Sequence, residues 1–159
     1  MLLKVNKSFN FSKKTRSLRN IRFLIIHYTG MQSARVSMNK LKNPNSKVSC
    51  HYLIERNGTI FRMVDDNKVA WHAGKSKWKN TNNLNKYSIG IEIQNKGHFI
   101  NYQNFPKKKI FSLIKLIKTL MKKNKLALNL SKTSIQLLLE SQDGGGWKLI
   151  GSADPVRTN

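Results

Sequence analysis

The sequence predicts an α/β domain with a mixed central β-sheet flanked by helices. Three patterns lead to this prediction. An apolar run over 21–27 and an alternating run over 88–93 predict two core strands. An Asn-Gly pair at 57–58, between two further alternating runs, predicts an antiparallel hairpin. A long amphipathic pattern after Pro106 predicts a helix packed on the sheet. The 159 residues suffice for one such core and are too few for two ordinary domains.

The first part of the chain predicts an arm, a strand and a helix. Residues 1–20 are basic, rich in Ser and Asn and without periodicity, which predicts a loosely ordered arm. The run 21–27 suits a buried central strand, and Gly30 ends it. A weak helical pattern predicts a helix over 33–41, which a turn at 43–46 closes.

The middle of the chain predicts a hairpin, a loop and a strand. Residues 48–55 and 59–64 flank the Asn-Gly turn and predict its two strands. Residues 71–85 are polar, apart from two tryptophans, and predict a long loop. In the run 88–95, isoleucines alternate with Gly90, Glu92 and Gln94, which predicts a strand with one face on the core.

The clearest helical pattern follows Pro106, a residue that suits the first turn of a helix. Six apolar residues share one face, and five lysines lie mostly elsewhere, as on a solvated helix surface. The apolar residues are Ile110, Leu113, Ile114, Ile117, Leu120 and Met121, and the lysines are Lys107, Lys108, Lys115, Lys118 and Lys122. Beyond this helix, periodicity gives way to a short apolar run and a glycine run. We therefore expect an arm at 1–20, a domain at 21–124 and an atypical tail at 125–159.

Net charge and cysteine content limit the classes of protein to which this chain can belong. Thirty Lys and Arg against seven Asp and Glu give a formal net charge of +23, which favours polyanionic partners. The basic residues are spread over nearly every segment, so a coding bias that fills solvated positions explains them equally well. No nucleic-acid-binding motif is present, and a basic nucleic-acid-binding domain therefore has only charge to support it. The single cysteine, Cys50, excludes an internal disulfide framework and fits either a reducing compartment or indifference to one.

The sequence shows no export or membrane segment. The basic start of the chain is not followed by the apolar stretch of a signal peptide, and no segment approaches the roughly 18 apolar residues of a membrane helix. We expect a cytoplasmic monomer, with a periplasmic or extracellular location left open.

Glu92 is a carboxylate within a run whose neighbours are predicted to be buried, so it must pair, titrate or face a cleft. The alternative is an exposed glutamate on an edge strand. Four histidine-, glycine- and aromatic-containing motifs precede it in the chain. They are Ile-Ile-His-Tyr-Thr at 25–29, Ser-Cys-His-Tyr-Leu-Ile at 49–54, Asn-Gly-Thr-Ile at 57–60 and Ala-Trp-His-Ala-Gly at 70–74.

In this order and spacing, the motifs resemble those of the zinc-dependent N-acetylmuramoyl-L-alanine amidases of the type 2 family, whose fold the peptidoglycan recognition proteins share. The resemblance covers about 21–124. It implies zinc-dependent hydrolysis of the amide between N-acetylmuramic acid and L-alanine. The implied substrate is peptidoglycan or a muropeptide. A non-catalytic module that binds peptidoglycan remains the alternative.

The resemblance also implies roles for individual residues. The family's first zinc ligand, a histidine that closes the first core strand, corresponds to His27, for which a core histidine is the alternative. The family's strand carboxylate corresponds to Glu92, which would orient or deprotonate the zinc-bound water. Trp71, His72 and Trp78 would wall the substrate cleft.

Two neighbouring residues receive separate predictions. His51 is grouped with the substrate-binding residues, and a packing or hydrogen-bonding role beside the cleft is its alternative. Cys50 falls where some relatives place a tyrosine near the metal. Without an activating neighbour it is expected to be a small buried residue and not a nucleophile.

The chain departs from the family beyond the long helix. Family members place a second zinc histidine, a lysine and Asp-Pro-Gly there. The four histidines of this chain are His27, His51, His72 and His98. The second ligand is therefore absent from its expected place, and Val156 follows Asp154-Pro155 where the family has glycine. A complete zinc site would have to recruit His51, His72 or Asp154.

The tail itself suggests a cause for this departure. Codons such as CAT TCA ATT GCT CCT GGA A encode His-Ser-Ile-Ala-Pro-Gly, which is close to the family motif. Read one base later they encode Ile-Gln-Leu-Leu-Leu-Glu, the residues at 135–140. We hypothesise a frameshifted or truncated amidase whose last quarter is out of frame. Sequencing the gene locus tests this, because the hypothesis requires a His-Ser-…-Ala-Pro segment in the neighbouring frame.

Overall fold

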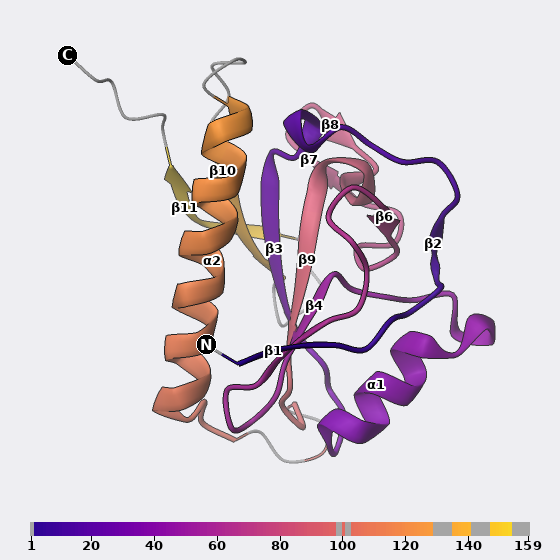
Figure 1. Ribbon diagram of the computed structural model, residues 1–159, viewed down its shortest axis with the longest axis vertical. Helices are drawn as coiled ribbons and strands as arrows, with labels where there is room; N and C mark the ends of the chain where they lie inside the picture. Colours follow the sequence, from indigo (N-terminus) through magenta and orange to yellow (C-terminus); the bar gives the residue numbers. More distant parts are fainter. Residues whose placement is uncertain (1, 98–99, 101–102, 129–134, 141–146, 154–159) are drawn as a thin grey trace.

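The computed structural model describes residues 2–97, 100, 103–128, 135–140 and 147–153, with the side chains among them up to residue 123. Its centre is a seven-stranded mixed sheet in the order β1-β5-β4-β9-β3-β10-β11 (Figure 1). These strands are β1 (Leu3–Val5), β3 (Phe23–Tyr28), β4 (Tyr52–Ile54), β5 (Ile60–Arg62), β9 (Ser88–Ile93), β10 (Ile135–Glu140) and β11 (Trp147–Ala153). The predicted mixed α/β architecture is confirmed.

Short strand pairs and helices complete the fold. The strand pairs are β2 (Phe11–Ser12) with β6 (Val69–Ala70), and β7 (Lys77–Trp78) with β8 (Thr81–Asn82). The helices are α1 (Ala34–Lys42) and α2 (Lys107–Leu128), with 3-10 turns η1 (Leu18–Asn20), η2 (Pro44–Ser46) and η3 (Leu84–Tyr87). Among the described residues, no helix combines the length and the apolar character that a membrane crossing requires.

Strand β9 lies in the middle of the sheet, parallel to β3 on one side and to β4 on the other. In this register Glu92 pairs with His27 of β3 and with Leu53 of β4. The alternative of Glu92 on an edge strand is therefore wrong. Because the three strands are parallel, their carboxyl ends meet at one edge, which is where open α/β sheets place ligands.

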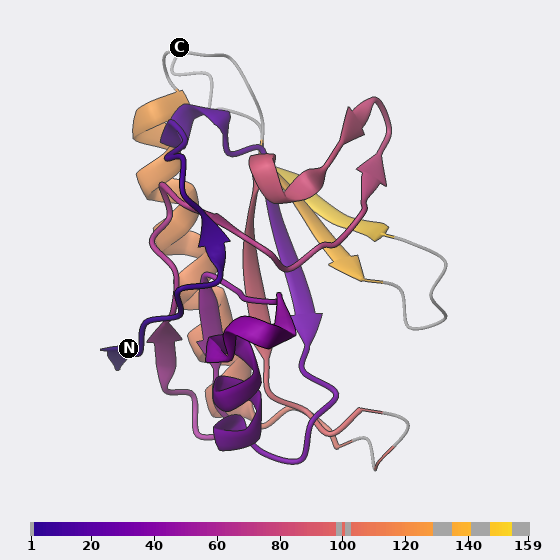
Figure 2. The ribbon, with the colours of Figure 1, turned by 90° about the vertical axis from the view of Figure 1, so that its right-hand side faces the viewer.

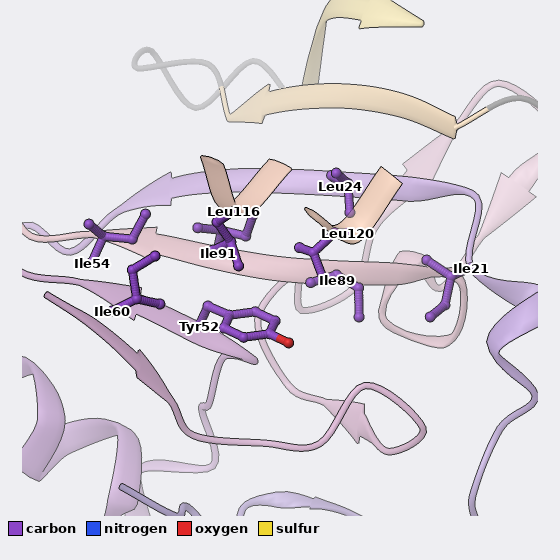
Figure 3. Close-up of a cluster of buried hydrophobic side chains, with 9 residues drawn as sticks. All are labelled: Ile21, Leu24, Tyr52, Ile54, Ile60, Ile89, Ile91, Leu116 and Leu120. Atoms are coloured by element: carbon purple, nitrogen blue, oxygen red, sulfur yellow. The ribbon is translucent and has the colours of Figure 1, made fainter. Parts of the chain in front are cut away.

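Alternation along β9 gives the strand two different faces. Ile89 and Ile91 point toward α2 and pack against Leu116 and Leu120 of that helix (Figure 3). All four side chains are at most 2% exposed, and burial of such a side chain contributes roughly 1.5–3 kcal/mol. The other face of β9, which carries Glu92, is left for the site. Figure 2 shows α2 on one side of β3 and β9, and the β7–β8 hairpin on the other.

Helix α2 begins directly after Pro106, whose carbonyl accepts hydrogen bonds from the N–H groups of Lys109 and Ile110. The five predicted surface lysines are exposed, as a solvated face requires. The predicted core position of Ile114 is wrong, because its side chain is 42% exposed. It follows Leu113 by about 100° around the helix and so lies beyond the buried stripe.

The hairpin and the first helix form as predicted. Strands β4 and β5 pair antiparallel around a turn in which Asn57 Oδ1 accepts from the N–H of Thr59. Gly58 has a φ of +88°, a conformation that favours glycine. Ser33 Oγ accepts from the N–H of Val36 and caps the start of α1.

The segment 1–20, predicted to be a loosely ordered arm, forms two strands within its described residues 2–20. Strand β1 pairs parallel with β5, and β2 pairs with β6. Buried polar side chains fix the segment between them. Ser8 Oγ donates to the carbonyl of Leu41, and Asn10 Nδ2 donates to the carbonyl of Val48 at 2.9 Å. Serine and asparagine are common in loops, so a composition rich in them predicts a loop. Composition does not show that these side chains hydrogen-bond to backbone groups far along the chain.

Two other segments also carry more structure than expected. The predicted loop at 71–85 contains the β7–β8 hairpin and the beginning of η3. Strand β10 pairs parallel with β3 and antiparallel with β11. The sheet therefore continues past residue 124, where the sequence placed the end of the domain. The pairing of β10 does not test the reading frame of 135–140, so the frameshift hypothesis stays a prediction.

Candidate active site

The candidate site lies where β3 and β9 end, on the sheet face opposite α2. Because His27 and Glu92 are register partners on parallel strands, their side chains project from the same face. Glu92 lines a pocket of about 390 Å³ together with His72. His27 is buried beside that pocket, 3% exposed, and its Nε2 lies 3.1 Å from His72 Nδ1.

His72 connects His27 to the start of β9. Its Nε2 lies 3.0 Å from Ser88 Oγ, and its ring meets the His27 ring edge-on, with 5.2 Å between the centroids. Burial lowers the pKa of His72 well below its usual value, and nearby His27, His51 and Arg16 lower it further. The ring is therefore neutral at physiological pH.

Gly90 makes room for the His72 ring. A Cβ at residue 90 would lie 2.3 Å from His72 Cγ, and 2.5 and 2.6 Å from two other ring atoms. Only glycine leaves this space free. The sequence reasoning did not assign a role to Gly90, although a glycine inside a strand is a known sign of close approach by another group.

His51 lies on the other side of Gly90 from His27, and it is fully buried. Its Nδ1 accepts from the N–H of Gly90 at 3.0 Å, and its Nε2 lies 3.1 Å from the carbonyl oxygen of Lys68 and 2.9 Å from Arg16 Nη2. Burial and then the charge of Arg16 lower the pKa of His51 to about 3. This environment does not match the predicted substrate contact. It matches the alternative, a hydrogen-bonding role beside the cleft.

Arg16 holds the loop that carries His72. Its Nη1 donates to the carbonyl of Asn85 at 2.9 Å, and its Nε donates to the carbonyl of Asp66 at 3.0 Å. Asn85 Oδ1 in turn accepts from the N–H groups of His72 and Ala73. Burial lowers the pKa of Arg16 to about 10, which still leaves the side chain charged at neutral pH. Sequence reasoning missed both Arg16 and Asn85, because neither lies in a motif.

Trp71 separates two pockets. Its N–H donates to Ser49 Oγ at 2.9 Å, and its Nε1 donates to Ser12 Oγ at 3.4 Å. With Glu92 and His72, the 390 Å³ pocket is lined by Thr29, Met31, Ser37, Lys40, Leu41, Val48, Ser49 and Trp71. A second pocket, of about 520 Å³, is lined by Ser12, Val69, Trp71, Gly74, Lys75, Ser76, Asn82, Asn83, Asn85 and Lys86.

Two sequence-predicted residues lie outside these pockets. Trp78 lines neither of them and packs against the cluster of Phe23, Ile25 and Leu84. Cys50 is fully buried, and burial followed by the charge of Glu92 raises the pKa of its thiol. The thiol is therefore protonated and shielded, as expected for a small buried residue.

The described residues do not complete a zinc site. Within the part of the chain that the structure describes, no three His, Cys, Asp or Glu side chains converge to hold a metal. A catalytic zinc usually takes three protein ligands. His51 uses both ring nitrogens in hydrogen bonds, so it does not serve as a ligand. His98 and Asp154 lie outside the described residues.

The chain is thus an α/β domain in which two central parallel strands bring a histidine and a glutamate together at a candidate site. A family model described as N-acetylmuramoyl-L-alanine amidase matches residues 17–140. The chain therefore belongs to this amidase family, as the motif order predicted.

Individual relatives agree. The 1,6-anhydro-N-acetylmuramyl-L-alanine amidase AmpD of Haemophilus influenzae is 42% identical over 76 residues, which are 48% of this chain and 39% of the relative. The N-acetylmuramoyl-L-alanine amidase AmiD of Escherichia coli is 37% identical over 86 residues, covering 48% of this chain and 29% of the relative. The match thus spans well under half the length of these curated relatives.

Solved structures show the same fold. E. coli AmiD in complex with anhydro-N-acetylmuramic acid-L-Ala-D-gamma-Glu-L-Lys has a TM-score of 0.59 at 30% identity, covering 71% of this chain and 47% of that one. AmpDh3 of Pseudomonas aeruginosa has a TM-score of 0.61 at 29% identity, covering 74% and 51%. The predicted fold class is confirmed by both.

Proposed function

We propose that the chain is an N-acetylmuramoyl-L-alanine amidase that hydrolyses the amide between N-acetylmuramic acid and L-alanine. One observation carries this proposal: His27 and Glu92 are paired in register at the strand ends, beside a pocket that Glu92 and His72 line. The relatives named as amidases support the reaction class. The names of the AmpD relatives favour a 1,6-anhydro-muropeptide, and hence a cytoplasmic recycling role, over intact wall.

The two pockets suit a substrate with two chemically different halves. A muropeptide joins an uncharged sugar ring to a peptide with free carboxylates. The indole of Trp71, whose Nε1 donates to Ser12 Oγ, offers an aromatic face between the pockets. Lys75 and Lys86 line one pocket and Lys40 the other, so carboxylates meet positive charge on either side.

Glu92 is assigned the proton transfers. Its carboxylate would take a proton from the attacking water as the oxygen bonds to the amide carbon. The proton then passes to the alanine nitrogen as the carbon–nitrogen bond breaks, which leaves a carboxylate and a free amine. The family's zinc would need two ligands besides His27. Because the described residues do not supply that set, no step here is assigned to the metal.

The same observation favours a second candidate, a module that binds muropeptide without cleaving it. Both candidates require the pockets, and only the first requires chemistry at Glu92. Purified chain, with and without added zinc, is incubated with anhydro-N-acetylmuramic acid-L-Ala-D-γ-Glu-L-Lys. Released tripeptide is measured by mass spectrometry, and binding is measured by calorimetry.

If the chain is an amidase, peptide is released. Glu92→Gln should then lower the rate of peptide release by roughly 10²–10⁴-fold, the usual contribution of a general base. The matched control is Asp65→Asn, which neutralises an exposed carboxylate that pairs with Arg62. Binding with no product, with or without zinc, supports the second candidate. Absence of binding contradicts both. A nucleic-acid partner would instead show affinity that falls steeply with salt.

A further inference from the structure

Large apolar side chains gather on the surface of the N-terminal segment. Among the described residues, eight large apolar side chains are exposed, and four of them lie within residues 2–9, namely Leu2, Leu3, Val5 and Phe9. The exposed fraction of Phe9 reaches 76%. Single apolar residues on a surface need no explanation, whereas a cluster of them marks an interaction site. The segment 2–9 is therefore a candidate contact surface.

Buried polar neighbours hold this segment in place with its apolar side chains outward. Ser8 and Asn10 are 1% and 3% exposed. Ser8 Oγ donates to the carbonyl of Leu41 at 2.6 Å, and Asn10 Nδ2 donates to the carbonyl of Asn43 at 2.8 Å. Turning Phe9 inward would break these buried hydrogen bonds and leave the carbonyls without a donor. The exposure of Phe9 is thus built into the fold.

Three of the exposed residues border one small hollow. Val5, Lys7 and Phe9 line a cavity of about 120 Å³. The other residues that line it are Ser8, Phe11, Arg62, Met63, Val64, Asp65 and Lys68. Leu3 precedes Val5 by two residues on β1 and so shares its face of the strand. We call Leu3, Val5, Lys7 and Phe9 the N-terminal patch.

Positive charge surrounds the N-terminal patch. Lys7 is exposed, and Arg62 and Lys68 line the same hollow. The one carboxylate among the lining residues, Asp65, lies 3.6 Å from Arg62 Nε and is paired with that cation. The first 54 residues of the sequence contain no Asp or Glu. The partner that complements this surface is therefore both apolar and negatively charged.

We propose that the N-terminal patch docks the chain on the surface of an anionic lipid bilayer. Leu3, Val5 and Phe9 enter the boundary between headgroups and acyl chains, and Lys7 meets the lipid phosphates. Binding in a membrane interface combines burial of apolar area with attraction to anionic headgroups, and the patch offers both. The proposal goes beyond the proposed amidase activity and does not depend on it.

Two other occupants fit the patch less well. A second copy of the chain, packed through the same surface, would bring Lys7 and its neighbouring cations against their own counterparts. A single-stranded nucleic acid stacks its bases on aromatic side chains, which leaves the aliphatic Leu3 and Val5 without a partner. A bilayer instead accepts aliphatic and aromatic side chains alike and supplies the negative charge.

The test is cosedimentation of the full chain with vesicles of phosphatidylcholine, alone or mixed with phosphatidylglycerol. We expect binding to the mixed vesicles only. Replacing both Leu3 and Phe9 with serine should lower the partition coefficient by roughly tenfold or more, because two apolar side chains no longer enter the interface. Lys7→Gln should lower it about fivefold, the usual contribution of one cation beside an anionic bilayer. Circular dichroism checks that these surface variants are folded.

The matched controls lie on helix α2. Phe111→Ser removes an apolar side chain that is 62% exposed, and Lys118→Gln removes an exposed cation. Each should change the partition coefficient less than its counterpart in the N-terminal patch. Equal losses from Phe9→Ser and Phe111→Ser would overturn the proposal. Binding that salt abolishes and that Phe9→Ser leaves unchanged would also overturn it, because net charge alone would then explain the adsorption.

The rival occupants are measured on the same variants. Analytical ultracentrifugation without lipid should show the same mass for wild type and Phe9→Ser. A wild-type dimer that Phe9→Ser dissociates would make the patch an interface between copies and overturn the proposal. Anisotropy of a labelled single-stranded oligonucleotide provides the other comparison. Oligonucleotide binding that Phe9→Ser weakens, without binding to vesicles, would overturn it as well. None of these measurements reads activity, so their failure is distinct from failure of the amidase proposal.

Discussion

Gly90→Ala should displace the His72 ring and disconnect it from His27. The new Cβ would lie 2.3 Å from His72 Cγ, whereas ordinary van der Waals contact begins near 3.4 Å. One group must therefore move by about 1 Å. Strand β9 is held between β3 and β4, and the N–H of Gly90 is bound to His51, so the backbone has little freedom. The ring of His72 is the group that moves.

The expected cost in stability is about 1–3 kcal/mol, the usual range for overpacking a well-filled site. Urea unfolding monitored by circular dichroism measures it as a lower midpoint with an unchanged slope. Muropeptide binding, read by calorimetry, should weaken as well, because His72 and Glu92 line the same pocket.

A double-mutant cycle identifies the clash as the cause. If the Cβ of residue 90 strikes the ring, removing the ring with His72→Ala should make Gly90→Ala nearly neutral, and the two costs should not add. Two results would refute the reasoning. One is a Gly90→Ala protein as stable as wild type, and the other is a double mutant whose loss equals the sum of the single losses.

Three further outcomes are expected elsewhere in the molecule. Burial, followed by the charge of Arg56, lowers the pKa of Lys109 to about 8 from 10.5, so the unfolded chain binds more protons between these values. The contribution of Lys109 to stability should therefore rise between pH 8 and 10.5, while the buried Cys50 thiol, whose pKa is raised, acts in the opposite direction. Urea titrations at several pH values should show wild type gaining stability relative to Lys109→Met over this range. Cys50 should resist an aromatic disulfide reagent until urea unfolds the chain, and rapid native labelling would contradict its burial. Asn10→Ala should lower the unfolding free energy by about 1–3 kcal/mol, since the carbonyl of Val48 loses its donor; an unchanged midpoint would mean that residues 1–20 are not anchored.

Hydrophobic periodicity in the sequence predicted the main strands and the long helix of the fold. The alternation in 88–93 and the 3.6-residue repeat after Pro106 depend only on neighbours in the chain, and both elements formed as expected. The anchoring of residues 1–20 depends on Ser8 and Asn10 meeting carbonyls more than thirty residues away. No local pattern contains that information. The pairing of β10 with β3 is equally non-local, and it was missed for the same reason.

The candidate site was predicted in part because its motifs follow one another in a recognisable order. His27 and Glu92 came from that order, and their shared face follows from parallel register. What the order does not reveal is how side chains from separate motifs contact one another. The approach of His72 to His27 depends on Gly90, which lies in a third motif and contributes only the absence of a side chain.

His51 and His72 show why residue type alone does not define a role. Both belong to histidine motifs, and both approach Gly90. The N–H of Gly90 and the carbonyl of Lys68 occupy both nitrogens of His51, so that ring stabilises the sheet and has no nitrogen left for chemistry. The nitrogens of His72 instead meet a serine hydroxyl and another imidazole, groups that can each donate or accept. His51 therefore acts as a structural residue, whereas the direction of the hydrogen bonds of His72 depends on two other side chains.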